Sequence, residues 1–183
     1  MSTLEILLWT LGAVAAAALL YRGAVALRVY LKYRGDRLVV CPETRKPAAV
    51  EVAAGRAAAG GAAGRLKLRL SDCSRWPERE DCGQDCLSQV EADPANCLVW
   101  NIVNAWYAGK NCTLCGKPFG TINWHDHRPA LLDIERKTVQ WIDVPPEHLP
   151  EVFATHWPVC WDCHIAESFR RRHPELITER RPH

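Results

Sequence analysis

Two CxxC pairs carry the clearest chemistry in this sequence of 183 residues. Four cysteine thiolates are soft ligands that can complete a tetrahedral site, and such a site suits Zn²⁺. Gly116 directly follows the first pair and permits the tight turn that would aim both sulfur atoms inward. We therefore predict a structural zinc ion that holds together a small domain, bound by Cys112, Cys115, Cys160 and Cys163.

A second set of cysteines precedes these pairs and has irregular spacing. An Ala/Gly-rich segment separates its first member from the other three. We interpret the set as a second zinc site, with an iron–sulfur cluster as the alternative. Cys97 falls beside the apolar stripe of an expected helix, so we interpret it as a buried thiol. The second set consists of Cys41, Cys73, Cys82 and Cys86.

The last CxxC pair also reads CxxCH, since His164 follows Cys163. CxxCH is the attachment motif of c-type haem. A haem here would make the protein an electron carrier, and it would need a distal ligand such as His127 or His156. It would also need the cysteine-bearing part to lie outside the cytoplasm, so the choice between zinc and haem depends on membrane topology.

The chain opens with an apolar run from Leu4 to Tyr21 whose only charged residue is Glu5. A helix of about 20 apolar residues crosses the roughly 30 Å hydrocarbon layer of a membrane. A cleaved signal peptide is the alternative, but no Lys or Arg precedes the run, and its small residues lie inside it. We predict an uncleaved transmembrane anchor and juxtamembrane helix over residues 1–31.

Positive charge is concentrated on one side of this anchor. The positive-inside rule places such a flank in the cytoplasm. We therefore expect a single-pass protein of the bacterial inner membrane, with the N-terminus outside and the C-terminal domain cytoplasmic. Cysteines in a reducing compartment are better read as metal ligands than as disulfides, and this placement disfavours haem. The basic residues are Arg22, Arg28, Lys32, Arg34 and Arg37.

The sequence after the anchor predicts an α+β fold in two parts, residues 32–110 and 111–183. The second part ends in a basic tail. The net charge of +2 is too small to indicate that the chain as a whole binds nucleic acid. Alternating and amphipathic patterns predict the secondary structure. We expect a flexible loop over 53–65, strands over 49–52, 66–70, 121–124 and 139–142, and helices over 81–92, 94–108, 147–155 and 162–172.

Residues 112–168 resemble the HNH/treble-clef family. The resemblance is carried by the first CxxC pair, by Asp126-His127-Arg128-Pro129, and by CxxC-His at residues 160–164. It implies a treble-clef-like part with a structural zinc, His127 as the general base, and Asp126 and His164 as ligands of a catalytic divalent ion. The family's asparagine before the third cysteine is replaced here by Thr155.

The sequence thus predicts a membrane-anchored, cytosolic zinc-binding module that is non-catalytic and binds a protein partner. The support is a full set of structural ligands beside an incomplete catalytic set. The first alternative is an enzyme, an HNH-like metal-dependent endonuclease, and only this alternative implies a nucleic-acid partner. The second alternative is an electron carrier with an iron–sulfur cluster or c-type haem.

Overall fold

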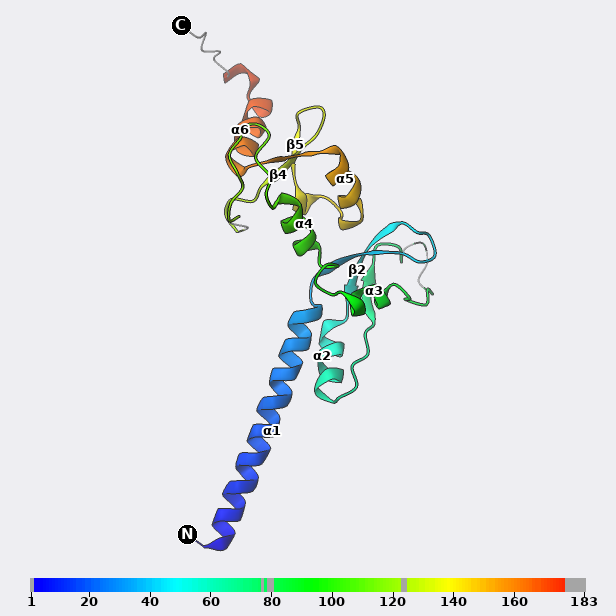
Figure 1. The fold of residues 1–183 in the computed structure, drawn as a ribbon, viewed down its shortest axis with the longest axis vertical. Helices are drawn as coiled ribbons and strands as arrows, with labels where there is room; N and C mark the ends of the chain where they lie inside the picture. The colour runs from blue at the N-terminus through cyan, green and yellow to red at the C-terminus, as the bar shows by residue number, and fades with distance from the viewer. Residues whose placement is uncertain (1, 77, 79–80, 123–124, 177–183) are drawn as a thin grey trace. The chain divides into compact units, whose positions relative to one another are not determined.

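The computed structural model describes residues 2–76, 78, 81–122 and 125–176. These residues form a mixed structure of helices and sheets, as the sequence predicted (Figure 1). The chain divides into two compact units, Met1–Leu98 and Val99–His183, and each is described separately. We call them unit 1 and unit 2.

Helix α1 (Thr3–Tyr33) forms the start of unit 1 and is 31 residues long. Ser2 and Glu5 cap its N-terminus reciprocally, because each side chain accepts a hydrogen bond from the backbone amide of the other residue. The apolar side chains of its first two thirds are exposed, whereas Val29 near the C-terminal end is partly buried and Tyr33 is buried. The helix is long and apolar enough to cross a membrane.

Unit 1 contains a three-stranded antiparallel sheet in the order β1-β2-β3. The strands are β1 (Asp36–Val40), β2 (Pro47–Val52) and β3 (Leu70–Cys73). Alternate residues of β2 face the core, so that Ala48, Val50 and Val52 are buried. Val90 of helix α3 (Leu87–Ala92) completes this core and is fully buried.

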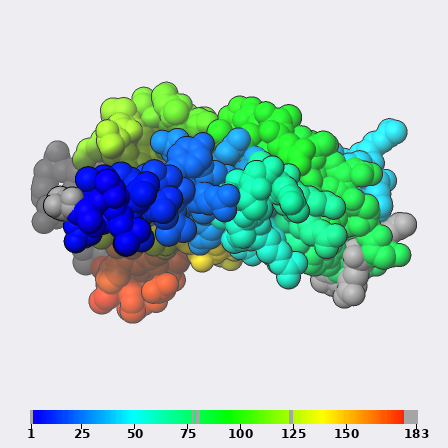
Figure 2. Space-filling view, turned by 90° about the horizontal axis from the view of Figure 1, so that it is seen from below, coloured from blue at the N-terminus to red at the C-terminus, as the bar shows by residue number. Residues whose placement is uncertain are grey.

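Residues 54–62 form helix α2 (Ala54–Ala62), where a flexible loop was predicted over 53–65. Alanine favours helix, and the buried Ala54, Ala57 and Ala58 give α2 an apolar face. This helix packs beside the C-terminal part of α1 (Figures 1 and 2). A methyl group at Gly61 would lie only 2.9 Å from Val29 Cγ2, so glycine permits the close approach. Tertiary packing therefore orders this Gly-rich segment.

The helix predicted over 81–92 is shorter in the structure, where α3 begins at Leu87. Gln84 has a φ of +59°, which a helix does not allow. Its side-chain oxygen accepts a hydrogen bond from the backbone amide of Leu70, at 3.1 Å, and so fixes the non-helical turn against β3. Cys82 and Cys86 consequently do not share one helical face. The strand predicted over 66–70 is displaced to 70–73.

Unit 2 begins with helix α4 (Val99–Tyr107) and contains a second three-stranded antiparallel sheet, in the order β5-β4-β6. Leu131, Leu149 and Val159 are fully buried in this unit. The strands are β4 (Ala130–Leu132), β5 (Thr138–Gln140) and β6 (Trp157–Val159). The other helices are η1 (Trp141–Asp143), η2 (Pro146–His148), α5 (Leu149–Thr155), α6 (Trp161–Arg172) and η3 (Pro174–Leu176).

The helices predicted over 147–155 and 162–172 correspond to η2 with α5 and to α6. The strand predicted over 139–142 is shifted to β5 at 138–140. Residues 121–122 are not in a strand, and residues 123–124 of that predicted strand lie outside the described residues. Strands β4 and β6 were not predicted.

Candidate metal centre

The first CxxC pair lies in a tight turn, which we call the first knuckle (residues 111–118). The amide of Cys112 donates to the carbonyl of Lys117, and the amide of Gly116 donates to the carbonyl of Cys112, both at 2.8 Å. Gly116 has a φ of +73°, a conformation that glycine adopts without strain. The turn brings Cys112 and Cys115 to the same side of the backbone.

The second CxxC pair lies where β6 meets α6. Cys160 is the N-cap residue of α6, and Cys163 lies in the first turn of the helix. The amide of Thr113 in the first knuckle donates to the carbonyl of Pro158 in β6, at 2.9 Å. This hydrogen bond joins the two halves of the site.

The four sulfur atoms of Cys112, Cys115, Cys160 and Cys163 all lie within 4.8 Å of one another. Those of Cys115 and Cys160 are 3.7 Å apart. A tetrahedral ion with Zn–S bonds of about 2.3 Å places its sulfur ligands roughly 3.8 Å apart. The tetrad could therefore hold a metal ion such as zinc, as the sequence predicted.

The tetrad has an uneven electrostatic environment. Burial raises the pKa of the Cys112 thiol, but backbone amides, first that of Cys160, stabilise its thiolate and bring the pKa down to about 7. Burial raises the pKa of Cys160 and Cys163. The Cys112 thiol thus ionises more readily than those of Cys160 and Cys163.

The three residues predicted to be catalytic do not form a comparable cluster. His127 and Asp126 are exposed, whereas His164 is buried, and burial lowers its pKa. The His164 Nδ1 atom lies 2.8 Å from the Thr138 hydroxyl. Among the described residues, Asp126, His127 and His164 do not have ligand atoms that all lie within 4.8 Å of one another.

His127 and His164 do share one neighbour that the sequence did not identify. The Trp161 ring lies 6.3 Å from the His127 ring and 5.8 Å from the His164 ring, measured between centroids. Trp161 lies between the cysteines of the second CxxC pair, and this place in the sequence could have indicated that it is close to the site. Thr138 gave no such signal, because it reaches His164 only through the pairing of β5 with β4.

Thr155 occupies the position of the family's asparagine and ends α5. Its hydroxyl donates to the Glu151 carbonyl at 2.9 Å and lies 2.9 Å from His156 Nδ1. These contacts keep the Thr155 hydroxyl within its own helix and beside the next residue.

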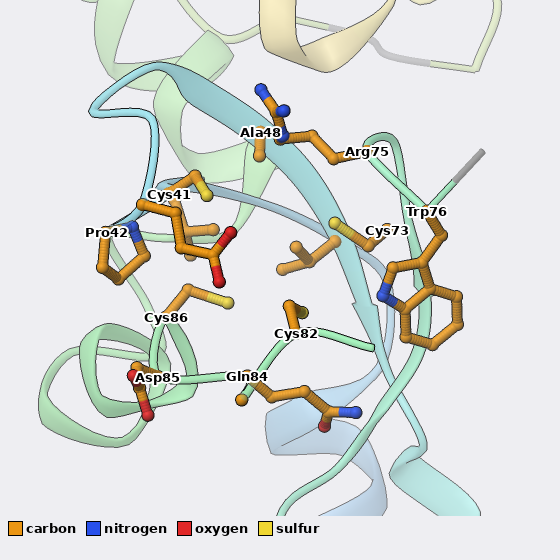
Figure 3. Close-up of a pocket in the computed structure, with 14 residues that line it drawn as sticks. Cys41, Pro42, Ala48, Cys73, Arg75, Trp76, Cys82, Gln84, Asp85 and Cys86 are labelled. Carbon is orange, nitrogen blue, oxygen red and sulfur yellow. The ribbon is translucent and has the colours of Figure 1, made fainter. Parts of the chain in front are cut away.

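The second predicted set of cysteines also comes together, in unit 1. Cys41, Cys73, Cys82 and Cys86 all line one cavity (Figure 3). They do not form, among the described residues, a group as close as the tetrad. The half-buried Cys97 lies outside this cavity lining, and its thiol contacts the Gln89 carbonyl at 3.6 Å.

Comparisons of the chain with protein-family models, with curated proteins and with solved structures found no match.

Proposed function

We propose that the protein is a membrane-anchored module in which a structural zinc ion organises unit 2. The convergence of the four tetrad sulfur atoms within 4.8 Å carries this proposal. Zinc is the metal favoured by four thiolates in a tetrahedral arrangement.

The proposed role of this zinc is structural and not catalytic. Four protein ligands close the coordination shell of zinc, whereas catalytic zinc sites keep one position open for water. The three strands of unit 2 have only three residues each, so its sheet provides little core of its own. A metal that joins the first knuckle to α6 supplies the missing connection.

The proposed location is the bacterial inner membrane, with α1 as a single transmembrane segment. The exposed apolar surface of α1 supports this assignment. The basic residues after its apolar part support a cytoplasmic location of the two folded units. A closed metal site on a membrane anchor is suited to binding a protein partner near the inner leaflet, and this is the function we propose.

Elemental analysis with a visible spectrum tests the proposal on the full chain in detergent. We expect zinc in the wild type and a lower zinc content in Cys160→Ser, with Cys97→Ser as the matched control whose zinc content is unchanged. A Soret band would show haem, and visible absorbance that bleaches on reduction would show an iron–sulfur cluster. Either spectrum from the tetrad, or the absence of any metal, would contradict the proposal.

An HNH-like nuclease is the second candidate. The order of first knuckle, β4–β5 hairpin and α6 carrying His164 resembles a treble clef, and His127 and His164 both lie near Trp161. Nicking of supercoiled plasmid with Mg²⁺ or Mn²⁺, abolished by His127→Ala and retained in His148→Ala, would support this candidate. Absence of nicking with either ion would reject it.

A further inference from the structure

The turn between β1 and β2 repeats the backbone of the first knuckle, and we call it the second knuckle (residues 40–47). The amide of Cys41 donates to the carbonyl of Lys46 at 2.9 Å, and the amide of Arg45 donates to the carbonyl of Cys41 at 2.7 Å. The same two bonds, with the same spacing along the chain, close the first knuckle around Cys112.

The two knuckles also share flanking structure and sequence. Val40 pairs with Pro47 as Asn111 pairs with Pro118, so each turn is closed by a bridge to a proline. The fifth residue of each turn, counted from its cysteine, has a positive φ: +56° at Arg45 and +73° at Gly116. The segments Cys41-Pro-Glu-Thr-Arg-Lys-Pro47 and Cys112-Thr-Leu-Cys-Gly-Lys-Pro118 both fit C-x-x-[CT]-x-K-P.

Thr44 marks the chemical difference between the knuckles, because it stands where the first knuckle has Cys115. The Thr44 hydroxyl oxygen is buried, and it has no hydrogen bond of good geometry. It nevertheless lies close enough to the Cys41 sulfur to lower the pKa of that thiol. The second knuckle therefore offers one thiol, and other elements would have to supply the remaining ligands of a metal site.

Three further cysteines meet this requirement. Cys73 ends β3 and pairs with Val50 of β2, Cys86 directly precedes α3, and Cys82 lies in the connection between them. All three line the same cavity as Cys41, and in Figure 3 the sulfur atoms of Cys73 and Cys86 point into the space between the four side chains.

The size and lining of this cavity suit a single ion. Its volume is about 40 Å³, which exceeds the roughly 10–15 Å³ that one water needs but is far below the several hundred of a site for an organic ligand. Four cysteine side chains line the cavity, and four thiolates are the soft ligand set that a tetrahedral zinc ion takes.

We infer that unit 1 holds a second tetrahedral metal ion of the zinc class, bound by Cys41 of the second knuckle together with Cys73, Cys82 and Cys86. Its ligands are separate from the tetrad of unit 2, so this site goes beyond the proposed function. Binding draws the four sulfur atoms closer than they lie in the structure. Each unit of the chain then carries one metal-bound knuckle.

Metal stoichiometry of the full chain in detergent tests the inference. Wild type is expected to contain about two zinc ions per chain, one for each set of four ligands. Cys73→Ser or Cys86→Ser lowers the content to one, as does Cys160→Ser in the other set, and combining the two classes removes both ions. Cys97→Ser, the matched control, keeps both. If only the tetrad proposal were wrong, the zinc ion of unit 1 would therefore still be measured.

A rescue variant separates ligand loss from misfolding. Cys82→Ser removes one ligand of the second site, and Thr44→Cys in that background gives the second knuckle the CxxC pair of the first. Recovery of the second zinc in the double variant supports the inference. A wild-type chain with one zinc that only tetrad variants lose would overturn it. Iron with absorbance that bleaches on reduction, lost on Cys73→Ser, would also overturn it.

Discussion

The backbone amide of Cys160 donates a hydrogen bond to the Sγ atom of Cys112, 3.3 Å away. The bond connects the N-cap of α6 to the first knuckle, across 48 residues of sequence. An amide that donates to sulfur favours the thiolate over the thiol, which explains why the pKa of Cys112 falls to about 7 although the side chain is buried. The backbone thus favours the thiolate, the metal-binding form, at one ligand of the tetrad.

The four tetrad cysteines are therefore not expected to be equivalent. Cys112 is buried and Cys115 is exposed, so Cys112→Ser removes a prepared thiolate and also disturbs the packing beneath it. We expect Cys112→Ser to lower zinc affinity more than Cys115→Ser, and each by more than the roughly 10–100-fold that loss of an outer-shell partner costs. Competition with a chromophoric chelator measures both affinities. Equal affinities of Cys112→Ser and wild type would contradict the assignment.

The sequence predicted the tetrad because each CxxC pair is a local pattern whose geometry needs few assumptions. It did not predict β4 and β6, because strands of three residues are too short to show a period. It treated 53–65 as a loop, because the order of α2 comes from packing on α1 and not from local preference. The two knuckles share two backbone hydrogen bonds that a CxxC pattern could not indicate, since Thr44 interrupts that pattern in the second knuckle.

Arg37 shows a further limit of sequence reasoning, since we counted it only as one charge of the basic flank. Its side chain is buried, with 1% exposed, and it donates hydrogen bonds to the carbonyls of Lys32, Arg34 and Pro94. Arg37→Met leaves those carbonyls without their donor, so we expect a loss of about 3 kcal/mol from the free energy of unfolding of unit 1. Urea unfolding monitored by circular dichroism measures this loss.

The exposed Arg69 provides the matched control for Arg37. Arg69→Gln removes the same charge without a buried hydrogen-bond network, and surface substitutions of this kind usually change stability by less than about 0.5 kcal/mol. If Arg37→Met and Arg69→Gln had the same effect, Arg37 would not connect the end of α1 to the segment around Pro94.

Ionisation of the buried Tyr107 should make the stability of unit 2 depend on pH. Its hydroxyl donates to the Ala130 carbonyl at 2.9 Å, and burial raises its pKa far above the value of about 10 in an unfolded chain. The pKa of Tyr107 is higher in the folded state than in the unfolded chain. The stability that the neutral hydroxyl contributes is therefore complete below pH ~10 and is lost as the pH rises above that value. Unfolding titrations between pH 8 and 11 should show this decline.

Tyr107→Phe isolates the contribution of that hydroxyl. The variant leaves the Ala130 carbonyl without its donor, so we expect a loss of about 1–2 kcal/mol at pH 8. Its stability should also depend less on pH above 10 than that of the wild type. Tyr30→Phe is the control, because Tyr30 is exposed and should leave the profile unchanged. Parallel profiles for Tyr107→Phe and wild type would show that Tyr107 ionises equally easily in both states.

The membrane assignment makes a quantitative prediction for α1. Leu11 and Val14 lie in the middle of its apolar part and are exposed in the folded chain, 66% and 67% respectively, so neither packs in a protein core. One arginine at the centre of a transmembrane helix costs about 2.5–3.5 kcal/mol of insertion free energy. We therefore expect the double variant Leu11→Arg/Val14→Arg to lose most of its membrane-bound fraction after alkaline carbonate extraction. The apolar double variant Leu11→Val/Val14→Leu should remain in the membrane pellet. Extraction of the wild type into the soluble fraction would contradict the assignment of α1 as a transmembrane segment.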